Sequence, residues 1–380
     1  MLLTDPNSLE KFSTPHRVWQ GIPGIVQTKG GRLFVCFYSG SIKETYGNYA
    51  MIVKSEDGRA FGEPIAVATD TGASRCFDPV LWIDPLDRLW FIWNRTPGDL
   101  VFGSICENPD ADELVWGKEF YIGHGVMMNK PTVLKDGRWL FPISIWPMTL
   151  HDYLRFPVLE EGEVSGAYAY ETRDQGATFT RLGAVTYPEY GRTCDEHMFF
   201  ECDDGSIRML IRIRRGIAES FSYDGGRTWS EPTESSLKGP ASRFFIRRLR
   251  SGRVLLINHY DFTDRNNLTA LLSEDGGKTF PYRLLLDGRS NVSYPDAHEG
   301  EDGYIYLTYD RDRGGNCASL EQAYGHAREI LVARITEKDI LTGTLGEGSY
   351  LASVASKLGG LSPTDSDPYT VDGISSIPTP

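Results

Sequence analysis

Short, mostly apolar runs of strand length fill most of the chain, and polar turns that contain glycine separate them. Two such runs joined by a short polar turn form a unit that recurs six times. The six units begin at Gly24, Asp78, Pro131, Met198, Phe244 and Ala297. Each is followed by at least one more run of strand length, and helical periodicity is almost absent. The pattern therefore predicts an all-β fold.

A second repeat follows several of these units, a turn of the form Ser/Thr-x-Asp-x-Gly-x-Thr-aromatic. Its central aspartates are Asp57, Asp174, Asp224 and Asp275, and the copy at Asp57 is one residue shorter. The last two intervals are 50 and 51 residues, whereas the first is 117 and leaves room for a degenerate copy near Cys106. Four-stranded units of about 50 residues are typical of propeller blades. Six units predict a six-bladed β-propeller, with a β-sandwich as the alternative.

One domain is expected, a propeller over residues 1–345, followed by a flexible tail over residues 346–380. The end of the chain is rich in Ser, Pro, Gly and Thr and poor in aromatic residues, a composition that does not build a core. A short helix is expected near residues 336–341.

Composition and charge narrow the partners that such a propeller could have. The 380 residues carry a formal net charge of −13, which argues against nucleic acid or an anionic membrane as a partner. No leader and no membrane-spanning run is visible, so a cytoplasmic location is expected unless a leader was removed. The six cysteines have no zinc-ligand spacing and are expected to be reduced, and neither a metal nor a cofactor is predicted. The oligomeric state is left open.

The repeated aspartate turn is identified as the Asp-box, and through it the chain resembles the sialidase (neuraminidase) superfamily of six-bladed propellers. In an Asp-box the Ser/Thr and Asp side chains bond the backbone of a tight turn, and glycine takes a positive φ. In this superfamily such turns lie on the outer rim, so their aspartates are not catalytic candidates. The resemblance covers residues 15–340 and implies a glycoside hydrolase that acts on a glycan.

The resemblance also implies roles for four residues near strand ends. Sialidases use a tyrosine nucleophile, and a neutral phenol avoids the repulsion between a carboxylate nucleophile and an anionic substrate. The phenol needs a nearby base, because free tyrosine has a pKa near about 10. By resemblance, Tyr294 is the nucleophile and Glu196 is its base. Arg212 and Arg265 are then the residues that bind the anionic group of the substrate.

The N-terminal part of the chain departs from the superfamily pattern. Sialidases usually carry Arg-Ile-Pro there, and that arginine completes a carboxylate-binding triad, whereas here Gly21 precedes Ile-Pro. A bidentate contact between arginine and carboxylate is strong and specific, so either another cation or another substrate is expected. The candidates for that cation are Arg75, Lys130 and Arg192.

The proton donor to the leaving group is a second departure. Sialidases place an aspartate in the loop after the first inner strand, and here Glu44 is the only carboxylate in that loop. Glu44 is therefore the predicted acid/base, with Asp78 as the alternative. Asp78 and Asn48 are otherwise predicted to bind the substrate. His197 is expected to lie on the other side of the strand from Glu196, where it either packs or supports the site residues from behind. Other residues predicted to face the pocket are Asn48, Asn129, His259, Asp296 and the run 309–313.

These residues together predict an exo-acting glycoside hydrolase that retains configuration through Tyr294 and releases a terminal, acidic sugar similar to sialic acid. Gly21 keeps a second possibility open, a propeller glycosidase or lyase that acts on a neutral or uronic sugar. A third possibility is a propeller that binds carbohydrate without catalysis.

Overall fold

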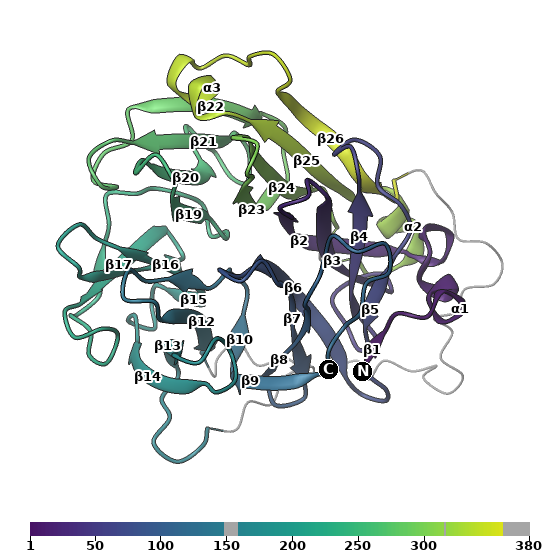
Figure 1. Cartoon of the computed structure of the whole chain (residues 1–380), viewed down its shortest axis with the longest axis horizontal. Coiled ribbons are helices and arrows are strands. Elements are labelled where there is room, and N and C mark those ends of the chain that lie inside the picture. Colours follow the sequence, from purple (N-terminus) through teal and green to yellow (C-terminus); the bar gives the residue numbers. More distant parts are fainter. Residues whose placement is uncertain (148–158, 315–316, 360–380) are drawn as a thin grey trace.

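The computed structural model of the chain describes residues 1–147, 159–314 and 317–359. Six antiparallel sheets are arranged as blades around a central axis (Figure 1). This arrangement confirms the six-bladed all-β propeller and excludes the sandwich. The chain builds the blades in sequence order, so each blade is one continuous segment.

The strands of each blade succeed one another from the axis outward. Blade one contains β2 (Trp19–Gln27), β3 (Leu33–Gly40), β4 (Tyr49–Ser55), β5 (Ala66–Ala68) and β1 (Leu2–Leu3). Blade two contains β6 (Arg75–Ile83), β7 (Leu89–Thr96), β8 (Leu100–Cys106) and β9 (Phe120–His124). Blade three begins with two short strands that pair with the same neighbour, and contains β10 (Val126–Met127), β11 (Thr132–Val133), β12 (Trp139–Ile145), β13 (Gly166–Thr172) and β14 (Thr180–Val185).

The other three blades have four strands each. Blade four contains β15 (Arg192–Glu201), β16 (Ile207–Ile213), β17 (Gly216–Ser222) and β18 (Thr233–Glu234). Blade five contains β19 (Phe245–Arg248), β20 (Val254–His259), β21 (Leu268–Ser273) and β22 (Tyr282–Asp287). Blade six contains β23 (Val292–Glu299), β24 (Ile305–Arg311), β25 (Glu329–Ile335) and β26 (Tyr350–Lys357).

Short helices connect or flank the sheets. They are α1 (Pro6–Leu9), α2 (Leu320–Tyr324), α3 (Glu337–Thr342) and the 3-10 turns Glu10–Phe12 and Thr14–His16. The helix expected near residues 336–341 is α3, which begins with a capping box between Thr336 and Asp339. No helix in the described part of the chain has the length and apolar character needed to cross a membrane.

The propeller extends past the boundary expected at residue 345, so that boundary is wrong. β26 pairs with β25 along most of its length and forms the outer edge of blade six. β26 runs directly into a segment rich in Ser, Gly and Pro, and that composition hid the strand. The rest of the expected tail, residues 360–380, lies outside the described residues.

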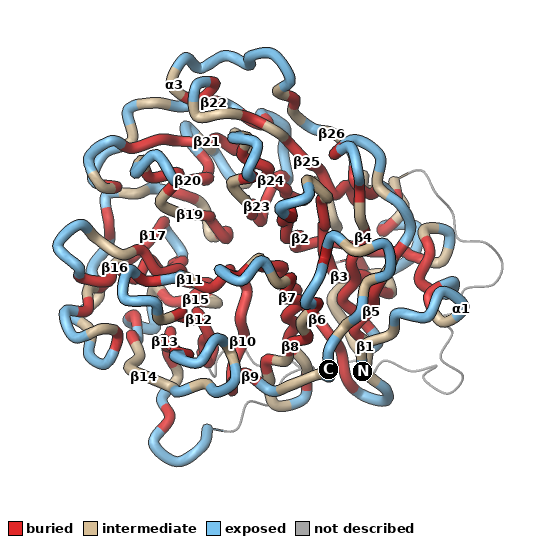
Figure 2. Tube along the Cα trace, viewed as in Figure 1, coloured by how far each residue is buried: buried red, intermediate tan, exposed pale blue. Residues whose placement is uncertain are grey.

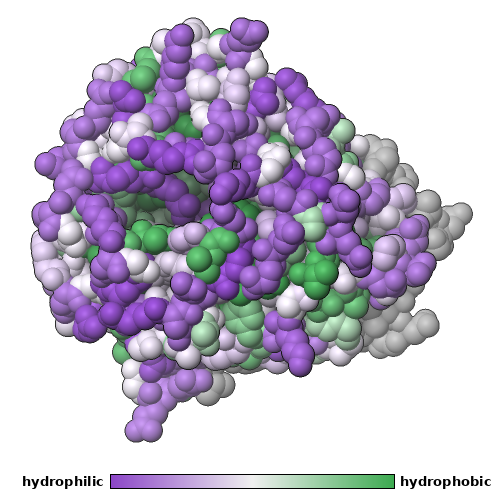
Figure 3. All heavy atoms as spheres, viewed as in Figure 1, coloured by the Kyte–Doolittle hydropathy of each residue, from purple (hydrophilic) through white to green (hydrophobic). Residues whose placement is uncertain are grey.

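The core lies between the blades, where apolar side chains of adjacent sheets pack together, and burial is greatest along the inner strands (Figure 2). The Asp-boxes close outer hairpins, as expected. In the hairpin between β21 and β22, Asp275 Oδ1 accepts hydrogen bonds from Ser273 Oγ at 2.7 Å and from the Thr279 N–H at 2.9 Å. The face viewed along the axis is hollowed near its centre, and hydrophilic residues dominate around the hollow (Figure 3).

The inner strands of four blades share one irregularity that positions the site. In β2, β6, β15 and β23 the pairing with the next strand shifts by one residue, which is a β-bulge, and β15 has a further shift between Arg192 and Asp195. Each bulge contains a residue with a positive φ, namely 56° at Ile22, 45° at Asp78, 41° at Glu196 and 55° at Tyr294, and in β15 the adjacent Asp195 has a φ of 56° as well. Non-glycine residues adopt this conformation at a free-energy cost, and such residues cluster at functional sites. The bulges break the strict alternation of the strands and redirect these side chains.

The ring closes where blade one meets blade six, and carboxylates of blade six hold the inner strand of blade one. The N–H of Ile22 donates to Asp310 Oδ2 at 2.9 Å, and the N–H of Ile25 donates to Asp296 Oδ2 at 2.8 Å. The side chain of Gln20 donates to the carbonyl oxygen of Arg328 at 2.7 Å. The seam therefore fixes β2 against β23 and β24.

Candidate functional site

Three residues named from the sequence meet at the bulges of blades four and six. Arg212, on β16, forms a short ion pair with Glu196, and its Nη1 lies 3.2 Å from the Tyr294 hydroxyl oxygen. The Tyr294 hydroxyl lies 3.4 Å from Glu196 Oε1, although 98 residues separate the two in the chain. All three side chains are buried. The arrangement places a phenol beside a carboxylate that can accept its proton.

Four arginines surround Tyr294. Arg212 contacts its hydroxyl, while the guanidinium carbons of Arg313, Arg265 and Arg243 lie 4.4, 5.2 and 5.5 Å from the centre of its ring. Cations at these distances are attracted by the ring's π electrons. The structure thus brings the predicted residue Arg265 to the nucleophile candidate and adds two arginines that the sequence did not single out as ligands.

These arginines differ in how their charge is balanced. Arg212 pairs with Glu196, and Arg313 Nη1 lies 3.2 Å from Asp310 Oδ2. Within residues 1–147, 159–314 and 317–359, the other two form no ion pair and donate to backbone carbonyl oxygens instead. Positive charge therefore exceeds negative charge around Tyr294, which favours an anionic group there.

The three cations expected to replace an arginine at Gly21 each pair with a carboxylate elsewhere. The pairs are Arg75 with Glu44 at 3.7 Å, Lys130 with Asp296, and Arg192 with Asp195 at 2.6 Å. The space beside Gly21 is taken by Arg313, because a Cβ added to Gly21 would lie 2.7 Å from Arg313 Cδ. The sequence placed Arg313 only within a polar run facing the pocket.

Two carboxylates are candidates for the proton donor. Asp78 is 3% exposed, and its Oδ1 has no hydrogen-bond partner among the described residues. Burial, followed by the Glu44 carboxylate, raises the pKa of Asp78 to about 7. Glu44 lies on the loop between β3 and β4 with 35% of its side chain exposed. A general acid must hold its proton near the working pH, so the deep burial of Asp78 makes it the stronger candidate.

Buried polar atoms without partners gather around these residues. In the described part of the chain they include the Tyr38 hydroxyl, Asp78 Oδ1, Glu196 Oε2 and Arg212 Nε. Tyr38 lies near both acid candidates, since burial and then the charges of Glu44 and Asp78 raise its pKa. Buried polar groups are rarely unpaired in folded proteins. A cluster of them indicates a site that receives the hydroxyl and charged groups of a polar ligand.

Other predicted residues support the backbone of the site. Asn129 donates to the carbonyl oxygens of Glu196 and His197 at 2.8 and 3.0 Å and so holds the bulge of β15. His197 Nε2 lies 2.8 Å from the carbonyl oxygen of Tyr168, and the side chain is buried, so it links blade four to β13 of blade three. Asn48 is buried and accepts the N–H of Thr45 at 2.6 Å, so it shapes the loop that carries Glu44.

One residue in each blade occupies the same position, two residues before a regular pair of the inner strand with the next strand. The six residues are Ile22, Asp78, Lys130, Glu196, Arg243 and Tyr294. Sequence reasoning missed Arg243 and Tyr38 as members of the site. The signal for Arg243 was available, because proline follows Ile22, Asp78, Lys130 and Tyr294 and marks the position from which blade five could have been aligned.

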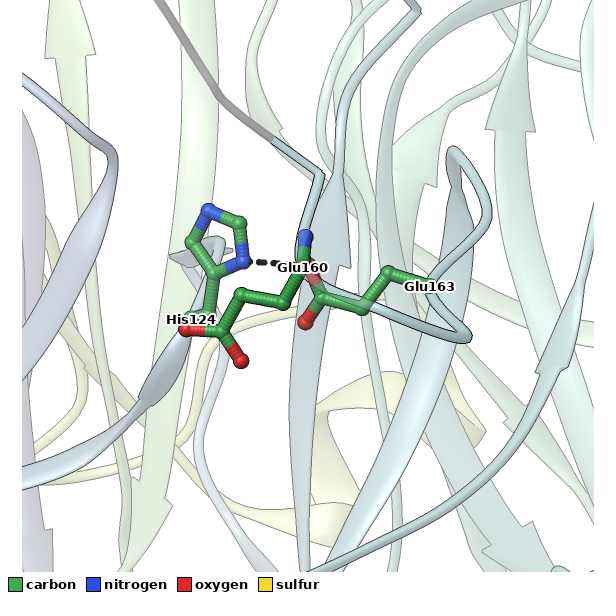
Figure 4. A group of neighbouring side chains, drawn as sticks. All are labelled: His124, Glu160 and Glu163. Atoms are coloured by element: carbon green, nitrogen blue, oxygen red, sulfur yellow. Dashed lines mark hydrogen bonds and ion pairs between the residues drawn. The ribbon is translucent and has the colours of Figure 1, made fainter.

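One group of described residues has the spacing of metal ligands. His124, Glu160 and Glu163 place ligand atoms within 4.8 Å of one another (Figure 4). Glu163 is already occupied, because one carboxylate oxygen lies 2.6 Å from His124 Nδ1 and the other pairs with Arg181. The protein's own groups thus satisfy the central carboxylate, which is typical of a structural ion-pair network rather than of a metal centre.

Comparisons with known proteins agree with this architecture. Residues 108–307 match the family described as the BNR repeat-like domain, which is more than half of the 380 residues. Comparison with curated proteins finds no match.

Solved structures of sialidases share the fold. The NanB sialidase from Streptococcus pneumoniae is 11% identical, with a TM-score of 0.65 over 86% of this chain and 70% of that one. A leech intramolecular trans-sialidase complexed with 2,7-anhydro-Neu5Ac is 12% identical, with a TM-score of 0.65 over 87% of this chain and 70% of that one. The Hadza microbial sialidase Hz136 is 18% identical, with a TM-score of 0.59 over 77% of this chain, which spans 64% of its length. At these identities the likeness shows a sialidase-like propeller fold.

Proposed function

Since the chain belongs to the family of BNR repeat-like domains, we propose that it is an exo-acting glycoside hydrolase with a Tyr294 nucleophile. One observation carries the proposal: the Tyr294 hydroxyl lies 3.4 Å from Glu196 Oε1 and 3.2 Å from Arg212 Nη1. A phenol is a weak nucleophile until a neighbouring base takes its proton. The likeness to sialidases supports the same reaction class by analogy of fold. The substrate is a glycan with a terminal acidic sugar.

In the first step, the Tyr294 oxygen attacks the anomeric carbon, and its proton passes to Glu196. The bond between that carbon and the leaving oxygen breaks, and Asp78 protonates the leaving oxygen. Arg212 holds the phenol and Glu196 together, and its positive charge stabilises the charge that develops on the phenol oxygen. The product is a glycosyl–tyrosine intermediate with inverted configuration.

In the second step, water attacks the same carbon and gives a proton to the ionised Asp78. Glu196 returns its proton to the Tyr294 oxygen as the glycosyl bond breaks. Two inversions give net retention, and both carboxyl groups end in their starting protonation states. Burial supports this role for Asp78, because it raises the pKa to about 7 and keeps the proton available at neutral pH.

The test is Tyr294→Phe, assayed with sialyl, uronyl, rhamnosyl and fucosyl aryl glycosides. We expect kcat on the accepted glycoside to fall at least about a thousandfold, because the nucleophile is lost. Tyr306→Phe is the matched control. Tyr306 lies on the neighbouring strand β24, and its hydroxyl donates to Asp302 Oδ2 at 2.6 Å. Full kcat in Tyr294→Phe would overturn the mechanism. An unsaturated sugar product from the unmodified protein would identify a lyase. Tight glycan binding by the unmodified protein without turnover would identify a non-catalytic binding propeller.

A further inference from the structure

Gly21 and Arg313 share one space at the seam between blades one and six. A Cβ at Gly21 would lie 2.7 Å from Arg313 Cδ and 3.2 Å from Asp310 Oδ2. Contacts below about 3 Å do not occur for real side-chain carbons, because van der Waals repulsion rises steeply there. Any larger residue at position 21 would therefore displace Arg313 from its present position.

Arg313 is held in this space by its own blade. Its Nη1 lies 3.2 Å from Asp310 Oδ2. Asp310 is fixed in turn, since it accepts the N–H of Ile22 at 2.9 Å and the hydroxyl of Ser293 at 2.7 Å. The Arg313 side chain is 13% exposed, and its guanidinium carbon lies 4.4 Å from the centre of the Tyr294 ring. The seam thus orients a cation onto the nucleophile candidate.

The charges around Tyr294 indicate what this cation binds. Among the described residues, Arg313 makes one ion pair, through Nη1, which leaves its other N–H groups without a protein acceptor. Arg265 has no carboxylate partner in the same part of the chain and donates to the carbonyl oxygen of Ala241 at 2.8 Å. Guanidinium groups with free donors match the two oxygens of a carboxylate, and an anion would offset the excess positive charge.

We propose that Arg313 supplies, from blade six, the cation missing at Gly21, and that with Arg212 and Arg265 it selects substrates carrying a carboxylate. The inference rests on the proposed function, because it concerns the same site. It assigns recognition of the acid group of that substrate, a sialic acid or a uronic acid, to these three arginines. It also explains the glycine, because position 21 must stay free of a side chain for Arg313 to reach the ring.

Binding should be measured without turnover, in a Tyr294→Phe background, so that affinity does not depend on the catalytic mechanism. The probes are the methyl α-glycosides of N-acetylneuraminic acid and of galacturonic acid, each compared with its neutral methyl ester. Arg313→Ala should weaken binding of the preferred free acid by about tenfold to a hundredfold, the loss typical of a charged hydrogen bond. Binding of the ester should change by less than about threefold.

Two further variants guard against simple unfolding. Gly21→Ala should reproduce part of the loss, because its Cβ would displace Arg313 without removing it. Arg334→Gln is the matched control, since Arg334, on β25 of the same blade, donates to the carbonyl oxygen of Gly348 at 2.9 Å and should leave both affinities unchanged. Equal weakening of acid and ester, or no weakening of either, would overturn the proposal. If Tyr294→Phe retains turnover while Arg313→Ala loses acid preference, the proposed mechanism fails and this inference stands.

Discussion

Asp78→Asn should make the protein more stable at neutral and alkaline pH, and the size of the effect follows from the position of Asp78. The side chain is 3% exposed, and burial, then Glu44, raises its pKa from 3.8 to about 7, while Arg75 and Arg243 oppose the shift. The folded state therefore binds this proton more tightly than the unfolded state. Stability contributed by the proton is full below the unfolded pKa and is lost as pH rises through about 7.

The magnitude comes from the difference of about three between the folded and unfolded pKa values at about 1.4 kcal/mol each, which gives on the order of 4 kcal/mol. Asparagine has the same shape, tolerates the positive φ of 45° and cannot ionise. The free energy of unfolding of Asp78→Asn minus that of the unmodified protein should therefore rise by about 4 kcal/mol between about pH 4 and about pH 8.

The assay is urea unfolding followed by tryptophan fluorescence at closely spaced pH values. Asp87→Asn, in the turn between β6 and β7, sets the baseline, because 61% of the Asp87 side chain is exposed. Infrared difference spectra between the two proteins should also show the carbonyl stretch of a protonated carboxyl at pH 6 and its loss at alkaline pH, independently of reversible unfolding. A flat stability difference together with no such band would refute the argument that Asp78 carries a proton near neutral pH.

Two further predictions concern the acid candidates Asp78 and Glu44 and the buried Lys130. Asp78→Asn should retain far more activity on aryl glycosides with good leaving groups than on those with poor ones, whereas Glu44→Gln should show no such dependence. The measurement is kcat/KM across aryl glycosides whose leaving groups have graded pKa values. The reverse pattern would make Glu44 the acid. Lys130→Ala should lower the free energy of unfolding by about 3–5 kcal/mol, because it leaves the Asp296 carboxylate buried without its partner. Denaturant unfolding would measure this loss, and the double variant with Asp296→Asn should recover much of it. If the single and double variants lost the same stability, the buried pair would not be the cause.

The fold could be predicted from the sequence because its signals are local. The hydrogen bonds of each Asp-box join residues only a few positions apart, as when Ser273 and Thr279 both donate to Asp275. The motif is therefore visible in one short stretch of sequence. Strand pairs joined by tight turns are local in the same way. β26 was lost because only three of its eight residues are buried and it runs into a segment rich in Ser, Gly and Pro.

The site could be predicted only in part, because its contacts join distant segments. Glu196 and Tyr294 were named through the resemblance, and nothing in their spacing of 98 residues would place them 3.4 Å apart. Arg313 reaches Gly21 only because the last blade closes against the first, a contact between residues nearly 300 positions apart in the chain. The assignments of Lys130 and Arg75 as substrate ligands stay predictions. Both residues form an ion pair with a carboxylate of the protein.

The repeated position on the inner strands suggests how one frame produces a reactive site. The equivalent residue is Tyr294 in blade six, Glu196 in blade four and Asp78 in blade two, each at a bulge with positive φ. In blade one it is Ile22, whose N–H is bound by Asp310, so that blade contributes a fixed backbone instead of a reactive group. Asp310 also positions Arg313. Blade six therefore supplies a cation that the inner strand of blade one lacks. The chemistry of the site therefore depends on which side chain each bulge presents. The contact between blades one and six places the cation, Arg313, on blade six.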